Sequence, residues 1–116
     1  MRPKVLGLLG LGKRAGAVCA GEEPAQSAVS HGKAKLLLVS SDAGAHTVRW
    51  VQNSAVPLLR LPVDKLELGQ ALGMRSCAVL AMVDAAMALA VAQSLECTDE
   101  ALLSRLQRQA KPRQRK

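Results

Sequence analysis

Two short, continuously apolar runs constrain the fold of this chain more than any other feature. Residues 35–40 read KLLLVS, and residues 77–83 read CAVLAMV. A strand covered on one face only alternates apolar and polar side chains, so an unbroken apolar run of this length is typical of a strand buried on both faces. Both runs are flanked by segments with helical periodicity. The pattern predicts an α/β fold in which helices cover both faces of a sheet.

The rest of the chain continues this alternation of helices and short strands. Further strands are predicted over residues 17–20 and 58–61, and helices over residues 3–15, 21–32, 42–54, 64–73, 84–96 and 98–110. The expected helix N-caps are Ser41 or Asp42, Asp64, Asp84 and Thr98, with Pro112 ending the last helix. Because we find no linker before about residue 96, residues 1–95 are predicted to form one domain. Residues 96–116 then form an amphipathic helix and a basic tail.

The composition excludes several classes of protein. A chain of 116 residues has the length of one domain, and with one Trp and neither Phe nor Tyr its core must be built from Leu, Val and Ala. Three widely spaced cysteines, without a CxxC pair, predict neither disulfides nor a metal site. No apolar run is long enough for a membrane span, and the N-terminus lacks the cleavage site of a secretory signal. We therefore expect a cytoplasmic protein with no metal and no cofactor.

The positive charge is unevenly distributed along the chain. The formal net charge is +7, and residues 105–116 contain six basic and no acidic residues. Residues 1–41 contain six basic and two acidic residues, whereas residues 42–104 contain four basic and seven acidic residues. The N-terminal part and the tail are therefore the expected contacts for a polyanion, and removal of the tail is expected to leave the domain folded.

One string resembles a phosphate-binding loop. Residues 7–13, GLLGLGK, match the first seven positions of GxxxxGK[ST], but the eighth residue is Arg14. That motif needs a hydroxyl to bind Mg²⁺ and a strand to precede the glycine loop. We expect a helix here and no nucleotide binding. A small nucleotide-dependent enzyme is the alternative that this string alone supports.

No other arrangement of residues predicts catalysis. His31 and His46 are isolated and are expected to be surface or capping residues. Glu22 and Glu23 are adjacent, so on a helix they point about 100° apart and cannot act together as an acid and base pair. Trp50 is expected to pack against the core, because a single Trp on an apolar helix is more often a packing residue than a stacking platform. We predict that the protein is not an enzyme.

Several strings in the same order resemble the ribosomal protein L-seven-Ae superfamily, and most closely its short bacterial YlxQ-like branch. They are LLGLGKRAGAVCAGEE, SHGKAKLLLVSSDAG, VPLLRLPVDKLELGQALG and CAVLAMVD, and they cover about residues 3–95. The resemblance implies a three-layer α/β/α sandwich with a four-stranded mixed sheet that binds kink-turn RNA. It also implies that the start of the second helix, through a GxNExxK-type motif, reads sheared G·A pairs. A loop before the last strand would cover an extruded base.

The recognition motif differs from the family pattern at most positions. The family glycine falls on Gly21, the next position on Glu22, the Asn on Glu23, the Glu on Pro24 and the Lys on Ser27. Only the glycine is kept. An ionised Glu23 can only accept hydrogen bonds, so it cannot donate to guanine O6 or N7 as Asn can. These substitutions favour an alternative function, a protein-interaction module on the same fold that has lost kink-turn recognition.

The resemblance and the charge distribution together define a candidate RNA-binding set. It comprises basic residues near the second helix, the motif positions, and the loop that would cover the base: Lys13, Arg14, Gly21, Glu22, Glu23, Ser27, Lys33, Lys35, Arg75, Ser76 and Cys77. The predicted function is non-catalytic binding of structured, kink-turn-like RNA, with ribosomal RNA as a candidate partner. The protein is expected to act as a monomer, with the basic tail as a second, sequence-independent contact.

Overall fold

The structure is a computed structural model that describes residues 4–110. The helices in this part of the chain are α1 (Lys4–Arg14), α2 (Glu22–Ser30), α3 (Ala45–Asn53), α4 (Lys65–Ala71), α5 (Ala85–Ser94) and α6 (Glu100–Ala110). The strands are β1 (Val18–Ala20), β2 (Leu36–Val39), β3 (Leu58–Arg60) and β4 (Val79–Met82). The elements follow the predicted order, and most of their bounds lie within a few residues of the predicted ones.

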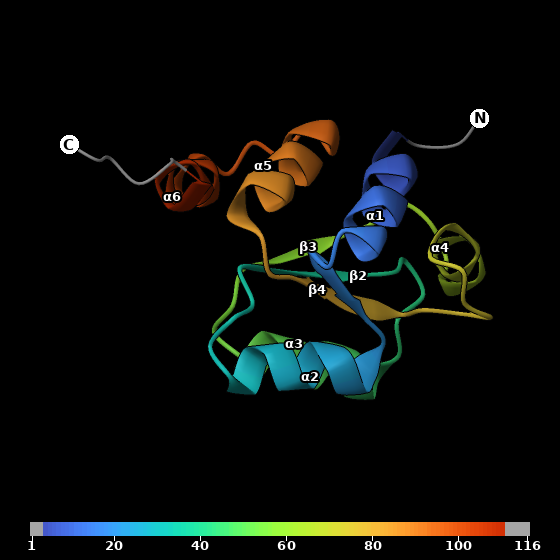
Figure 1. The fold of residues 1–116 in the computed structure, drawn as a ribbon. Coiled ribbons are helices and arrows are strands. Elements are labelled where there is room, and N and C mark those ends of the chain that lie inside the picture. Colours follow the sequence, from blue (N-terminus) through green and yellow to red (C-terminus); the bar gives the residue numbers. More distant parts are fainter. Residues whose placement is uncertain (1–3, 111–116) are drawn as a thin grey trace.

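The strands form one four-stranded mixed sheet. Its order is β1-β4-β2-β3, in which β2 and β3 run parallel while β4 pairs antiparallel with both β1 and β2. Helices α2 and α3 cover one face of the sheet, and α1 and α5 cover the other face (Figure 1). Helix α6 packs against α5, and α4 packs against α1. The prediction of a three-layer α/β/α sandwich with a four-stranded mixed sheet is confirmed.

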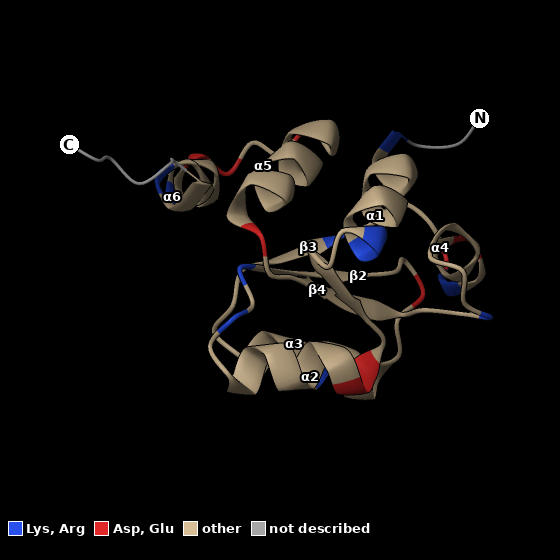
Figure 2. Ribbon diagram, viewed as in Figure 1, with Lys and Arg blue, Asp and Glu red and all other residues tan. Residues whose placement is uncertain are grey.

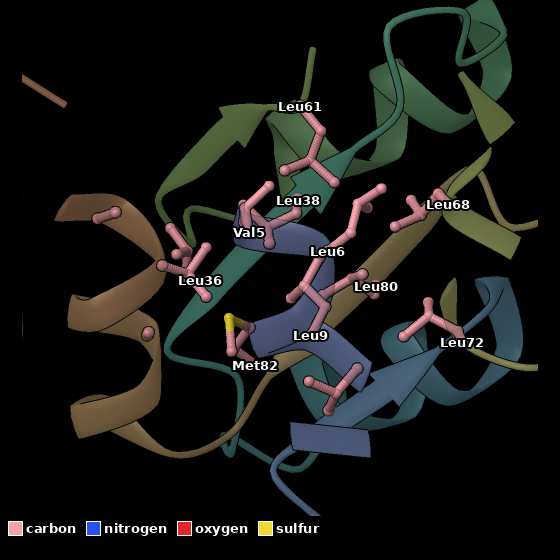
Figure 3. Packing of buried hydrophobic residues seen from close by; sticks show 14 of the residues in the cluster. Val5, Leu6, Leu9, Leu36, Leu38, Leu61, Leu68, Leu72, Leu80 and Met82 are labelled. Carbon is pink, nitrogen blue, oxygen red and sulfur yellow. The ribbon is translucent and has the colours of Figure 1, made fainter. Parts of the chain in front are cut away.

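The two central strands are buried on both faces, as their apolar runs predict. Leu36 and Leu38 of β2 point into the cluster beneath α1 and α5, whereas Leu37 and Val39 point into the cluster beneath α2 and α3. Strand β4 divides its side chains between the two clusters in the same way. Figure 3 shows the first cluster, in which the leucines of α1 lie over those of β2 and β4.

Helix α1 occupies the segment that resembles a phosphate-binding loop. Two of its glycines allow close packing and do not form a loop. A Cβ atom on Gly12 would lie 2.9 Å from Val18 Cγ2, and one on Gly10 would lie 3.1 Å from the carbonyl oxygen of Ala71. The prediction of a helix over this segment is confirmed.

The predicted N-cap of the third helix is wrong. Gly44 precedes α3 as its N-cap, and the Asp42 carboxylate is used elsewhere. Its Oδ1 accepts hydrogen bonds from Ser40 Oγ (2.9 Å) and from the backbone N–H of Lys65 (3.0 Å) at the start of α4. The Ser40 hydroxyl and, less strongly, the Lys65 N–H hold the pKa of Asp42 below its ordinary value, with burial opposing them. Asp42 therefore ties the loop after β2 to α4 and leaves α3 uncapped by a side chain.

Two other caps are confirmed. Asp64 Oδ1 accepts from the N–H of Glu67 (2.9 Å) at the start of α4, and Asp84 Oδ2 accepts from the N–H of Met87 (3.1 Å) at the start of α5. In each case the acceptor is three residues before the donor, which is the usual N-cap geometry.

The last helix begins one residue later than predicted and is part of the core. Asp99, rather than Thr98, receives the hydrogen bond from the N–H of Leu102 (3.2 Å). Leu106 is 0% exposed and belongs to the cluster beneath α1 and α5. A deletion that starts at residue 105 would therefore damage the core, contrary to our expectation that removal of residues 105–116 leaves the domain folded. The predicted stop at Pro112 lies outside the described residues.

The structure of residues 4–110 also bears on whether membrane spans, metal sites or disulfides occur in this part of the chain. None of their helices combines the length and the apolar character needed to cross a membrane. None of their His, Cys, Asp and Glu residues form a group of three that could hold a metal ion. Cys19, Cys77 and Cys97 are all free thiols.

Candidate nucleic-acid interface

The turn between β1 and α2 depends on Gly21. This residue has φ +101° and ψ 164°, a conformation that side chains disfavour, and it is the N-cap of α2. Its N–H donates to the carbonyl oxygen of Val79 (2.9 Å), which fixes the start of α2 against β4. A Cβ atom on Gly21 would lie 3.7 Å from Met74 Cε. The structure therefore brings the start of the predicted recognition helix beside the predicted covering loop, residues 74–77.

Residues 73–77 fold tightly back onto α4. The N–H of Met74 donates to the carbonyl oxygen of Gly69 (2.7 Å), and the N–H of Cys77 donates to that of Lys65 (2.9 Å). Between these bonds the backbone of Ser76 passes so close to Gly69 that a Cβ atom there would lie 2.5 Å from Ser76 Cα. Sequence reasoning missed Gly69, although a glycine inside a predicted helix was a signal of such a close approach.

The side chains of the covering loop face different ways. Arg75 and Ser76 are exposed, whereas Cys77 is only 3% exposed. The Cys77 Sγ donates to the carbonyl oxygen of Val79 (3.2 Å). Burial raises the pKa of the Cys77 thiol, against smaller opposing effects of its hydrogen bonds and of the charge on Lys13. Cys77 is therefore a buried thiol that supports the loop, and its side chain does not reach the surface.

The two acidic side chains at the start of α2, those of Glu22 and Glu23, have different surroundings. Oε2 of Glu22 accepts hydrogen bonds from Thr47 Oγ1 and from Trp50 Nε1 (3.4 Å), both on α3. The Thr47 hydroxyl is the largest cause that holds the pKa of Glu22 below its ordinary value, opposed by burial and assisted by Trp50. Glu23 is exposed. Sequence reasoning missed the partners of Glu22, because they lie 25 and 28 residues away and no local pattern signals them.

Trp50 and the two histidines lie as expected. Trp50 is half-buried against the cluster beneath α2 and α3, so its packing role is confirmed. His31 is the C-cap residue of α2, and its Nδ1 lies 2.8 Å from the carbonyl oxygen of Ser27. His46 is exposed on α3.

The basic candidates fall into two groups. Lys13 and Arg14, at the C-terminal end of α1, line a hollow of about 410 Å³ together with Gly73, which directly precedes the covering loop. Lys33 and Lys35 instead follow the far end of α2, and Lys33 shares a groove of about 460 Å³ with Ser27. Figure 2 shows red at the start of α2, where Glu22 and Glu23 lie, and blue at the end of α1.

We define the Gly21 face as the surface around the start of α2 and the covering loop. It consists of Lys13, Arg14, Gly21, Glu23, Met74, Arg75 and Ser76. The Glu22 carboxylate and Cys77 turn away from it. Ser27 lies further along α2, and Lys33 and Lys35 lie beyond its far end. The face combines exposed cations with the free end of a helix, which is an arrangement suited to a polyanion.

Comparison with known proteins gives matches among solved structures. No family model matches the chain, and no curated protein matches it. A protein of unknown function from Bacillus halodurans is 31% identical, with a TM-score of 0.73, over 82% of this chain and 99% of that chain. The 15.5kD RNA binding protein of Giardia lamblia is 26% identical, with a TM-score of 0.62, over 84% of this chain and 86% of that chain.

Proposed function

We propose that the chain is a non-catalytic protein that binds structured RNA through the Gly21 face, as a member of the L-seven-Ae-like superfamily, which its similarity to the two solved structures supports. Kink-turn RNA is the first candidate ligand, and ribosomal RNA is the class of molecule in which we expect it. The similarity to the Giardia RNA-binding protein supports RNA as the partner.

The observation that carries this proposal is the contact between the covering loop and the start of α2. Met74 lies against Gly21, while Arg75 and Ser76 extend the same surface into solvent. The first intrahelical bond of α2 runs from the N–H of Ala25 to Gly21. The backbone N–H groups of Glu22 and Glu23 therefore precede the helical ladder and can donate to RNA.

The chemistry of Glu23 suits one feature of RNA. Its exposed carboxylate can accept hydrogen bonds from guanine N1–H and N2–H, as in an unpaired or sheared guanine. The cations of Lys13, Arg14 and Arg75 would contact the adjoining phosphates, since phosphate contacts position a protein while base contacts specify the sequence. We propose that RNA binding here is weaker than in proteins with the complete motif, because Ser27 supplies no charge.

A binding titration tests the proposal. The probes are a kink-turn RNA, the same RNA with its G·A pairs replaced, and a plain duplex, all at one fixed salt concentration. The wild type is expected to prefer the kink-turn. Combined replacement of Lys13 and Arg14 by Ala should weaken binding, because both cations line the hollow beside the covering loop.

The control is Lys4→Ala, which removes one cation, rather than two, from the opposite end of α1. Lys4 lies about 14 Å along the helix from Lys13 at 1.5 Å per residue, so its loss should change affinity little. Equal, weak binding by wild type and variants to all three RNAs would refute RNA binding by this face. That outcome would favour the protein-interaction module instead.

A further inference from the structure

Glu22 is the first residue of α2 and stands at the edge of the Gly21 face. A carboxylate at this position would repel phosphate if it extended into solvent over the helix end. In the structure it does not. Its Oε2 lies between two donors of α3, Thr47 Oγ1 and Trp50 Nε1.

The two donors are arranged to hold one acceptor. Residues 47 and 50 are three apart on α3, so their side chains lie on the same face of that helix. Thr47 is only 8% exposed, and Trp50 is half-buried against the cluster beneath α2 and α3. Both donors are thus fixed by packing, and the carboxylate is the movable partner. Hydrogen bonds to an ionised acceptor are also stronger than those between neutral groups.

We infer that Thr47 and Trp50 are positioning residues for RNA binding, which hold the Glu22 carboxylate against α3 and so keep its charge away from the RNA. This inference rests on the proposed function. The two acidic residues then have different roles: Glu23 is available to guanine, whereas Glu22 joins α2 to α3. Neither Thr47 nor Trp50 touches the RNA in this arrangement.

A double-mutant cycle tests the inference. Thr47→Val keeps the shape of the side chain but removes the hydroxyl donor, and Glu22→Gln keeps an acceptor but removes the charge. Affinity for the kink-turn RNA is measured for wild type, both single variants and the double variant at one low salt concentration. Trp50→Phe, which removes the indole N–H and keeps most of the packing, is a further arm.

The expected result is a charge-dependent effect. Thr47→Val should weaken binding about threefold or more, the size expected for interactions between exposed charges. Trp50→Phe should weaken it less, because its hydrogen bond is the longer one. When Glu22→Gln is already present, Thr47→Val should change affinity no further. High salt should reduce the effect of Thr47→Val in the protein that keeps Glu22, because a released charge is screened.

Two outcomes would overturn the inference while leaving RNA binding intact. One is an unchanged affinity of Thr47→Val. The other is an equal loss of affinity with and without the Glu22→Gln substitution, which would mean that Thr47 acts through packing alone. Failure of the wild type itself to bind any RNA in the same titration would instead overturn the proposed function, and this inference with it.

Discussion

Replacement of Gly69 by Ala should destabilise the protein, although alanine is the better helix former. The new Cβ atom would lie 2.5 Å, 2.8 Å and 2.9 Å from the Cα, N and C atoms of Ser76. All three are backbone atoms, so no side chain can rotate to relieve the overlap. The covering loop must shift, and it is held at both ends by hydrogen bonds to α4, from Met74 and Cys77.

Two opposing effects set the size of this destabilisation. Ala in place of Gly inside a helix contributes up to about 1 kcal/mol of stability. Overpacking a close contact costs about 1–3 kcal/mol and more when backbone must move. We therefore expect a net loss of about 1–2 kcal/mol in the free energy of unfolding, or roughly 4–8 °C in Tm for a domain of this size. Displacement of the loop from Gly21 should weaken RNA binding as well.

Thermal and urea unfolding followed by circular dichroism measure the change. Gly7→Ala is the matched control, since Gly7 also lies inside a helix but a Cβ atom there would meet nothing within 4 Å. That variant should be at least as stable as the wild type, because it gains helix propensity without a clash. If Gly69→Ala were as stable as Gly7→Ala, the close approach to Ser76 would not constrain the fold and our reasoning would be wrong.

The charged groups give three further predictions. The pKa of Glu22 lies below its ordinary value of 4.5, so the stability that its ionised carboxylate contributes is present above pH 4.5 and is lost as the pH falls through the lowered pKa. Trp50 fluorescence should show this transition below pH 4.5, and the Glu22→Gln substitution should abolish it. Deletion of residues 111–116 removes four cations, so it should leave Tm unchanged but reduce the slope of log affinity against log salt by roughly 3. An unchanged slope would show that the tail makes no phosphate contact. Combined Glu23→Asn and Ser27→Lys substitution should raise affinity for a kink-turn about tenfold but not for a plain duplex, and an equal gain for both RNAs would indicate charge alone.

The amino-acid sequence by itself determined the layers of this fold. The runs at residues 35–40 and 77–83 lack polar alternation, and that pattern is typical of strands covered on both faces. Asp64 and Asp84 were identified as caps from sequence because a cap and its donor are three residues apart. Such features are local, so they can be read without the tertiary structure.

The tertiary structure alone decided which partners individual polar side chains bind. The sequence position of Asp42 predicts a cap for α3, but its carboxylate accepts a hydrogen bond from the N–H of Lys65, 23 residues away. The sequence places Glu22 among the candidate RNA-binding residues, but in the structure its carboxylate accepts a hydrogen bond from Thr47 on another helix. Gly69 is required by the path of the loop that returns past it. Periodicity reports which face of an element is buried, whereas the partner of a polar side chain depends on which distant residues the fold brings beside it.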